Sequence, residues 1–248
     1  SHNIIYMGTE RGLLVYDIRS GRYGQPAEHS PKDIRAVAMH EGRLWMGSAT
    51  GLYSCCLAAN DIRLENRQLQ NVYSLLSTPR GLLVGTIDGL ALRSPGGSIR
   101  RIPIGNGPQP LVNALAPDRG TNAVWIGTEG ALYRYDWRTF QPVAPLMGNS
   151  IKSLALHGDN IYAGTDNGMF IYNKVTNDVR HALHDSRSAR SIANNIVWAV
   201  YNDRWGNLWA GTDQGVSAIQ RRPFYTYTPP SDITHTGDGN CLHLIFRS

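Results

Sequence analysis

The stretch Trp209-Ala210-Gly211-Thr212-Asp213-Gln214-Gly215-Val216 decides the fold, because near-copies of it recur along the whole chain. In each copy an apolar or aromatic residue stands two places before a Gly-Thr or Gly-Ser pair, and a second glycine follows. The first glycines of the six copies are Gly8, Gly47, Gly85, Gly127, Gly164 and Gly211. They recur about every 40 residues, a period that is typical of β-propeller blades.

Each copy predicts two strands joined by a tight turn. The second glycine can adopt a positive φ, which hairpin turns often require. The first glycine has no side chain, so a neighbouring strand can approach it closely. In the fourth copy the second glycine, Gly130, comes one residue early.

Another strand precedes most of the hairpins. These runs are nearly continuous in apolar residues, as expected of a strand buried on both faces, and we interpret them as the inner strand of each blade. They span residues 34–38, 72–76, 111–115, 151–155 and 196–200.

The two ends of the chain complement each other. An inner-strand run at Cys241–Phe246 has no hairpin after it, and the hairpin at Ile4–Tyr16 has no inner strand before it. We therefore predict an all-β propeller of six four-stranded blades, in which the N- and C-terminal strands share one blade and close the ring. The alternative is part of a seven-bladed propeller with both ends free. In either case residues 1–248 form a single propeller domain.

Composition limits the other possibilities. The chain has 248 residues, 42% of them hydrophobic, and a net charge of +5. The basic residues are scattered, with no run longer than Arg100-Arg101 or Arg221-Arg222, so nucleic acid is not expected as a partner. Three cysteines, two of them adjacent, predict neither a disulfide framework nor a metal site. No apolar run approaches the roughly 18 residues that a membrane span requires.

The fifth full repeat, from Asn194 to Val216, is the most informative. Its Asp-x-x-Gly-Asn-Leu-Trp run from Asp203 to Trp209, followed by Gly-Thr and Gly, closely resembles the propeller repeat of two-component regulators. The resemblance places the chain in the periplasmic sensor region of bacterial hybrid two-component systems, which join a sensor histidine kinase to a response regulator.

The resemblance implies a periplasmic location and a role in sensing sugars. Sensors of this family usually carry two propellers, an immunoglobulin-like domain, a membrane span and a cytoplasmic kinase. Their propellers usually have seven blades, whereas six repeats are found here. The second propeller, the span and the kinase are missing from this sequence, so we expect it to be part of a larger sensor and not itself an enzyme.

Two sets of residues are candidates for binding a ligand. Asparagines enter several inner strands, where their amides could reach sugar hydroxyls; turn formation is the competing interpretation. Trp198 is aligned with the polar residues Ser74, Asn113, Ser153 and His243. That column either lines the central channel or bonds neighbouring blades. The candidate ligand-binding residues are Asn71, Asn113, Asn149, Asn195, Trp198, Asn240 and His243.

A second set is interpreted as structural. Aromatic residues at one register of the repeat predict packing between blades, with sugar stacking as the alternative. The structural set is Gly8, Trp45, Gly47, Gly85, Trp125, Gly127, Gly164, Trp209, Gly211 and Gly215. No metal is expected at His181 and His184, because no further ligands accompany them. No nucleophile elbow, phosphate-binding loop or distinctive carboxylate pair indicates catalysis, and no cofactor is expected.

The sequence therefore favours a periplasmic ligand-sensing propeller that responds to a glycan-derived sugar and signals to a kinase outside this chain. Its expected partners are an oligosaccharide or monosaccharide, other domains of the same sensor, and a second copy in a full-length homodimer. The alternative function is a scaffold propeller that binds another protein and no small ligand.

Overall fold

The computed structural model describes residues 3–24, 30–57, 59, 61–188, 190–219, 225–227 and 244–245. These residues form six four-stranded antiparallel sheets and one short 3₁₀-helix, η1 (Ala144–Leu146), so the chain is a six-bladed all-β propeller as the repeat predicted. Each sheet is one blade, numbered 1 to 6 in chain order. No helix among these residues is long and apolar enough to cross a membrane.

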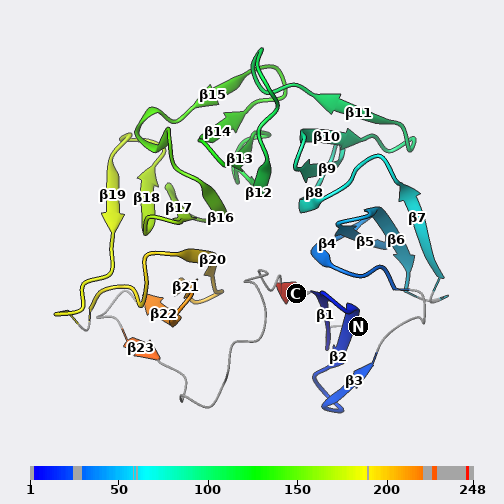
Figure 1. The fold of residues 1–248 in the computed structure, drawn as a ribbon, viewed down its shortest axis with the longest axis horizontal. Helices are drawn as coiled ribbons and strands as arrows, with labels where there is room; N and C mark the ends of the chain where they lie inside the picture. The colour runs from blue at the N-terminus through cyan, green and yellow to red at the C-terminus, as the bar shows by residue number, and fades with distance from the viewer. Residues whose placement is uncertain are drawn as a thin grey trace. The chain divides into compact units, whose positions relative to one another are not determined.

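The chain divides into two compact units. Figure 1 labels the strands of each blade. Unit 1 contains Ser1–Val112 and Cys241–Ser248. Blade 1 consists of β24 (Leu244–Ile245), β1 (Ile4–Thr9), β2 (Gly12–Asp17) and β3 (Arg22–Gly24). Blade 2 consists of β4 (Ile34–His40), β5 (Arg43–Ser48), β6 (Gly51–Cys56) and β7 (Asp61–Asn66). Blade 3 consists of β8 (Val72–Thr78), β9 (Gly81–Thr86), β10 (Gly89–Arg93) and β11 (Ile99–Ile102).

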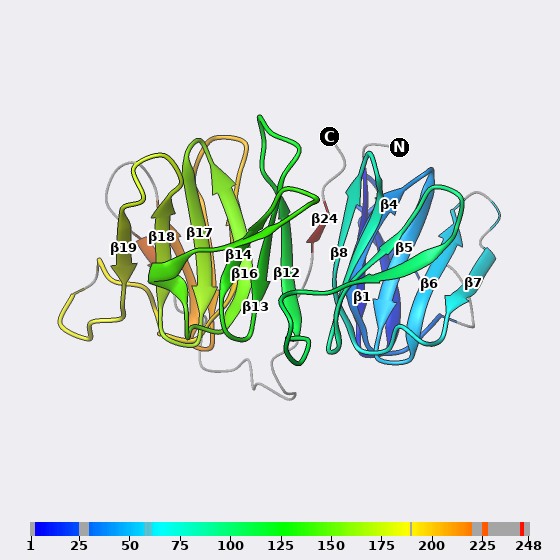
Figure 2. The same cartoon turned by 90° about the horizontal axis from the view of Figure 1, so that it is seen from above.

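Unit 2 contains Asn113–Asn240. Blade 4 consists of β12 (Val112–Pro117), β13 (Val124–Thr128), β14 (Leu132–Tyr135) and β15 (Phe140–Pro142). Blade 5 consists of β16 (Ile151–His157), β17 (Asn160–Thr165), β18 (Met169–Asn173) and β19 (Val179–Ala182). Blade 6 consists of β20 (Val197–Asn202), β21 (Leu208–Thr212), β22 (Gly215–Ile219) and β23 (Tyr225–Tyr227). Figure 2 shows β16 to β19 following one another across blade 5.

The predicted closure between the two ends of the chain is confirmed. The C-terminal strand β24 pairs antiparallel with β1, with Met7 opposite Leu244 and Tyr6 opposite Ile245. The last strand of the sequence thus supplies the inner strand that blade 1 otherwise lacks. The competing arrangement, an open propeller with both ends unpaired, is wrong.

The threonine or serine of the repeat stabilises the hairpin through its side-chain hydroxyl. In every copy the Thr or Ser side chain donates a hydrogen bond back across its own hairpin, for example from Thr9 Oγ1 to the Gly12 carbonyl (2.7 Å) and from Thr165 Oγ1 to the Gly168 carbonyl (2.8 Å). In the fourth copy Thr128 bonds the carbonyl of Ala131 (3.0 Å). Ala131, not Gly130, therefore occupies the position of the second glycine, and this copy has the same length as the others.

The first glycine of the repeat marks where two blades approach most closely. A Cβ on Gly47 would lie 2.3 Å from Val72 Cγ1, and one on Gly127 would lie 2.5 Å from Ile151 Cγ2. In both cases the β-branched residue begins the inner strand of the following blade. Any side chain at these glycines would force the two sheets apart.

The core lies between successive blades of each unit. One face of blade 2, formed by Ala38, Trp45 and Leu52, packs on blade 3. Ala116, Trp125 and Leu132 of blade 4 pack in the same way on blade 5. The corresponding residues of blade 5 pack on blade 6, and they are Ala155, Tyr162 and Met169.

Blade 6 carries the same three positions, here called the blade 6 face, but they are exposed. Tyr201 is 48% exposed, Trp209 40% and Val216 43%. A tyrosine also replaces the alanine that stands at this position in blades 2, 4 and 5. The blade 6 face is therefore apolar without being buried.

Candidate functional site

Four of the inner strands, β4, β8, β16 and β20, carry a β-bulge near their start, and the bulged residues form the candidate site. The register of β4 against β5 skips one residue between Ile34 and Ala36, which leaves Arg35 without a partner in the ladder. The same shift occurs in β8, β16 and β20. A bulge re-aims a side chain away from the sheet packing, and bulges are common beside binding sites. The bulged residues are Arg35, Tyr73, Lys152 and Trp198.

In unit 1 the bulged residues of two successive blades form a cation–aromatic pair. The Arg35 guanidinium carbon lies 4.8 Å from the centroid of the Tyr73 ring. Arg35 also donates to Asp33 Oδ2 (2.6 Å) and to Asn71 Oδ1 (3.1 Å). Burial works against the charge of Arg35, but the Asp33 carboxylate and Tyr73 hold its pKa above the ordinary value. The guanidinium is thus held by a carboxylate and an amide of the protein.

In unit 2 the equivalent residues form a second pair. The Lys152 ammonium lies 4.6 Å from the centroid of the Trp198 ring. The indole N–H of Trp198 donates a hydrogen bond to the Asp213 carboxylate. Lys152 and Trp198 are both partly exposed, so this pair can be reached by solvent. An aromatic face beside a fixed carboxylate and a cation is a combination suited to binding a polar ring.

The sequence alignment of the polar column is wrong by one position in part of the chain. Ser74 and Ser153 lie opposite Gly85 and Gly164 in the ladder, whereas Trp198 is the bulged residue. The true counterparts of Trp198 are therefore Tyr73 and Lys152. Ser74 Oγ donates to the Val112 carbonyl (3.2 Å) at the start of the next inner strand, so it bonds between strands.

The candidate asparagines already form hydrogen bonds within the protein, most of them with backbone groups. Asn71 has a positive φ of 47° and its carbonyl accepts from the Ile87 N–H (3.1 Å). Asn195 Oδ1 accepts from the His184 N–H (2.7 Å). Asn149 Nδ2 donates to the Met147 carbonyl (3.4 Å). The side-chain oxygens of Asn71 and Asn195 already have protein donors, which matches the strand-entry interpretation.

Three further candidates complete the set. Asn113 lies partly exposed in β12. Asn240 and His243 lie outside the described residues. Of the candidate ligand-binding residues, only Trp198 lies in the Lys152–Trp198 pair. Sequence reasoning missed Lys152, although its place directly after Ile151, as Trp198 follows Val197, was a usable signal.

The aromatic residues of the repeat divide into two groups. Trp45 and Trp125 are buried to within 1% and 2% exposure, but Trp209 is 40% exposed. Trp209 Nε1 donates to Asp203 Oδ2 (3.2 Å), and the same carboxylate accepts from the Trp205 and Asn207 N–H groups. These hydrogen bonds lower the pKa of Asp203 against the opposing effect of desolvation.

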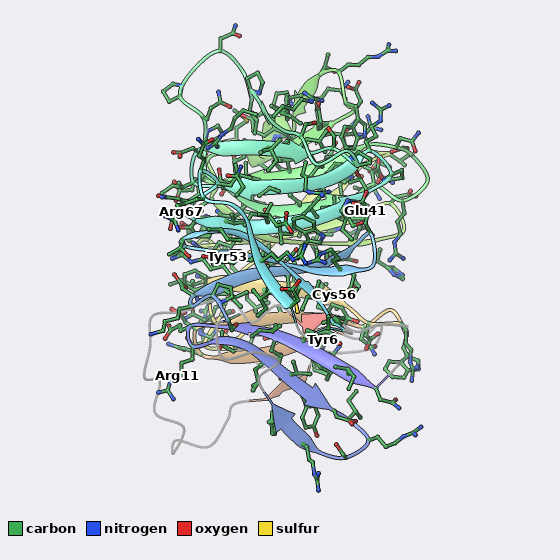
Figure 3. All side chains as sticks on the ribbon, turned by 90° about the vertical axis from the view of Figure 1, so that its right-hand side faces the viewer. Tyr6, Arg11, Glu41, Tyr53, Cys56 and Arg67 are labelled. Carbon is green, nitrogen blue, oxygen red and sulfur yellow. The ribbon has the colours of Figure 1, made fainter. Side chains whose placement is uncertain are left out.

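At the interface between blades 2 and 3, Arg93 covers the Trp45 ring. Its guanidinium lies 4.5 Å from the centroid of the Trp45 ring, and Nη1 lies 3.2 Å from Glu41 Oε2. Glu41 is in the β4–β5 turn, which Figure 3 shows at the opposite end of the strands from Arg67. His40 beside it is buried, which lowers the pKa of the imidazole, and its Nδ1 lies 2.9 Å from Ser77 Oγ.

At the interface between blades 4 and 5, a tyrosine and not an arginine packs on the tryptophan. Tyr172 packs edge-on against Trp125, with ring centroids 6.1 Å apart. Asp118, whose side chain is 2% exposed, pairs with Lys174 Nζ (2.6 Å) and Arg134 Nε (3.3 Å). Burial would raise the pKa of Asp118, but the hydrogen bonds from Lys174, Thr121 and Arg134 outweigh it and lower the pKa.

The two histidines of the long connection serve structural roles. His181 stacks on Phe170 with centroids 4.0 Å apart, and His184 Nδ1 lies 2.8 Å from the Ile192 carbonyl. In the part of the chain that the structure describes, no group of three or more potential metal ligands is present.

These features define the chain as a repeat propeller in which four inner strands carry polar or aromatic bulged residues. The family model of the two-component regulator propeller matches residues 191–214, within the last full copy of the repeat. A comparison with curated proteins gives no match.

Solved structures extend the match over most of the chain. The extracellular domain of BT4673 from B. thetaiotaomicron, described as a candidate one-component system, is 36% identical with a TM-score of 0.81, over 95% of this chain and 33% of that one. A second structure of this domain, described as a candidate hybrid two-component system, is 36% identical with a TM-score of 0.78, over 88% and 31%. The BT3049 extracellular domain from the same organism shares the fold at 19% identity and a TM-score of 0.74, over 90% and 32%. The chain thus spans about a third of the length of these relatives.

Proposed function

We propose that the chain is an extracytoplasmic sensor propeller of a hybrid two-component system, and that it responds to a sugar released from a glycan. The observation that carries this proposal is the 36% identity over 95% of the chain to the extracellular domain of BT4673, described as a candidate one-component or hybrid two-component system. The kinase that the signal reaches would lie elsewhere in the polypeptide, of which residues 1–248 would be one propeller domain. The location in the periplasm is part of the same proposal.

The ligand would bind at the Lys152–Trp198 pair. An indole face offers a stacking surface for a sugar ring, and Asp213 holds the indole by its N–H. The bulge presents Trp198 without disturbing the packing of β20 against β21. Ligand binding would favour one arrangement of the sensor over another, because a ligand shifts an equilibrium by its difference in affinity for the two states.

Calorimetric titration tests this proposal. The intact extracellular region and the 248-residue chain are each titrated with a panel of neutral and acidic oligosaccharides. Binding that Trp198→Ala abolishes, with unfolding by urea unchanged, is the expected result. A panel in which no sugar binds to the intact region would remove the sugar from the proposal.

A second function is favoured by the blade 6 face. Tyr201, Trp209 and Val216 are exposed where the same positions of other blades are buried. Exposed tryptophan and tyrosine are characteristic of protein interfaces. The chain would then be a scaffold that binds another protein domain. Tyr201→Ser and Val216→Ser would weaken such binding while leaving sugar binding intact, so the two functions can be separated.

A further inference from the structure

The two cation–aromatic pairs differ in how their positive charge is balanced. Arg35 of unit 1 forms an ion pair with Asp33 at 2.6 Å and a further hydrogen bond to Asn71. Lys152 of unit 2 forms no ion pair with a carboxylate of any described residue. The charge of Arg35 is therefore balanced by a direct ion pair, whereas the Asp213 carboxylate beside the unit 2 pair bonds the Trp198 indole and not Lys152.

No described residue accepts a hydrogen bond from the Lys152 ammonium, which lies over the Trp198 ring. An ammonium has three N–H groups, and a contact with the face of an aromatic ring uses the charge without providing a true acceptor for them. The Asp213 carboxylate in the same cluster accepts from the Trp198 indole, and it is not within ion-pair distance of Lys152. The cluster thus offers an aromatic face and a cation with unused donors at one partly exposed place.

We propose that Lys152 and Trp198 form a subsite for an anionic sugar unit, whose carboxylate or sulfate group accepts hydrogen bonds from Lys152 while its ring packs on Trp198. This inference rests on the proposed function and specifies the class of sugar. Carboxylate and sulfate share the chemistry that an ammonium recognises, so the experiment separates them. The net charge of +5 favours the approach of an anion over a longer range.

A contribution of Lys152 to stability alone is the alternative to be excluded. Lysine stems often pack along aromatic surfaces with the charge left in water. A purely structural role would make substitution of Lys152 change unfolding without discriminating between acidic and neutral ligands. Discrimination between ligands is therefore the measurement that decides.

The test compares three proteins against four probes. The intact extracellular region, as wild type, Lys152→Gln and the control Lys32→Gln, is titrated with a galacturonic acid trimer, a sulfated galactose, a neutral galactose trimer and inorganic sulfate. Lys32 is an exposed residue of unit 1, so the control removes the same charge away from the pair. Urea unfolding of each variant verifies that the fold is retained.

We expect Lys152→Gln to lower the affinity for the acidic sugars roughly tenfold or more, because a charge-assisted hydrogen bond is lost. Lys32→Gln should match the wild type, and raising the salt concentration should weaken acidic binding in the wild type but hardly in Lys152→Gln. The relative loss for galacturonate and sulfated galactose identifies the preferred anion. Binding of inorganic sulfate alone would assign the site to a free anion and overturn the sugar subsite.

Two other outcomes overturn the inference, and they differ in whether the proposed sensing function also fails. Neutral and acidic sugars that bind equally, both unaffected by Lys152→Gln, would reject the anionic subsite and leave the sensing function intact. The absence of binding by every sugar to the intact extracellular region would reject the sugar-sensing function together with the subsite.

Discussion

The interface between blades 2 and 3 and the interface between blades 4 and 5 each bury a tryptophan at the same position of the repeat, but different groups cover the two indoles. Trp45 is covered by the Arg93 guanidinium and Trp125 by the edge of Tyr172. The accompanying acid is Glu41 in the first interface, 41% exposed, and Asp118 in the second, 2% exposed. The repeat therefore specifies the buried indole, while the group that covers it is free to vary.

The comparison also shows what the tryptophan requires. Trp209 occupies the same register in blade 6, yet it is 40% exposed. Burial of the indole is thus a property of the interface and not of the repeat itself. Substitutions at the three tryptophans and at the two acids test this distinction.

The largest effect is expected at the buried indoles. Trp45→Ala and Trp125→Ala should each lower the free energy of unfolding by about 3–5 kcal/mol, because they leave a large cavity between two blades. Trp209→Ala should cost about 1 kcal/mol or less, since much of its side chain is already in water. Urea unfolding of the three variants measures the difference. Equal losses at all three sites would contradict the comparison.

The second effect concerns the acids. Asp118→Asn should cost about 3 kcal/mol, because it leaves the charges of Lys174 and Arg134 beside a buried amide. Glu41→Gln should cost less than about 1 kcal/mol, because Glu41 is well exposed and its ion pair with Arg93 is screened by solvent. The same urea measurements apply at pH 7 and low salt. A Glu41 variant as damaged as the Asp118 variant would show that exposure does not govern the outcome.

The third prediction concerns pH. The pKa of Asp118 is lower in the folded chain than the ordinary aspartate value of 3.8, so the stabilisation from its charge is present above that value. It is lost as the pH falls below about 4 through the folded pKa, because the unfolded chain then binds the proton more readily. Unfolding free energies of the wild type and Asp118→Asn, measured from pH 6 to pH 3, should converge at the acidic end. Parallel curves would mean that Asp118 does not contribute to acid sensitivity.

The smallest effect is expected at Arg93. Arg93→Met keeps an unbranched apolar stem over Trp45 but removes the charge, and should cost about 0.5–1 kcal/mol. If Glu41 is first changed to glutamine, the further loss on changing Arg93 isolates the contact with the indole. A double-mutant cycle over Arg93 and Glu41 provides this number.

Much of the fold could be predicted because it depends on short-range signals. Glycine at hairpins, a threonine that bonds its own turn and an apolar inner strand are all visible in the letters of each repeat. The pairing of β24 with β1 followed from complementary incomplete halves. The Ala131 hairpin was misjudged because the hydroxyl of Thr128, and not a glycine, defines its length.

The candidate site could be predicted only in part. The runs 151–155 and 196–200 were aligned at their isoleucines, which set Trp198 beside Ser153. In the ladder Ile151 corresponds instead to Val197, so Trp198 is equivalent to Lys152. The contact between Lys152 and Trp198 joins two blades and has no signature within one repeat. The exposure of Trp209 likewise depends on a neighbouring surface that its own repeat does not encode.

The close approach at the first glycine has a consequence for how such a protein can change. The gap between Gly47 and Val72, or between Gly127 and Ile151, is narrower than a single methyl group would need. Contact between each glycine and its β-branched neighbour therefore fixes the distance between successive sheets. Substitutions at the bulged residues do not change this contact. The chain can thus exchange its recognition chemistry while the dimensions of its frame stay constant.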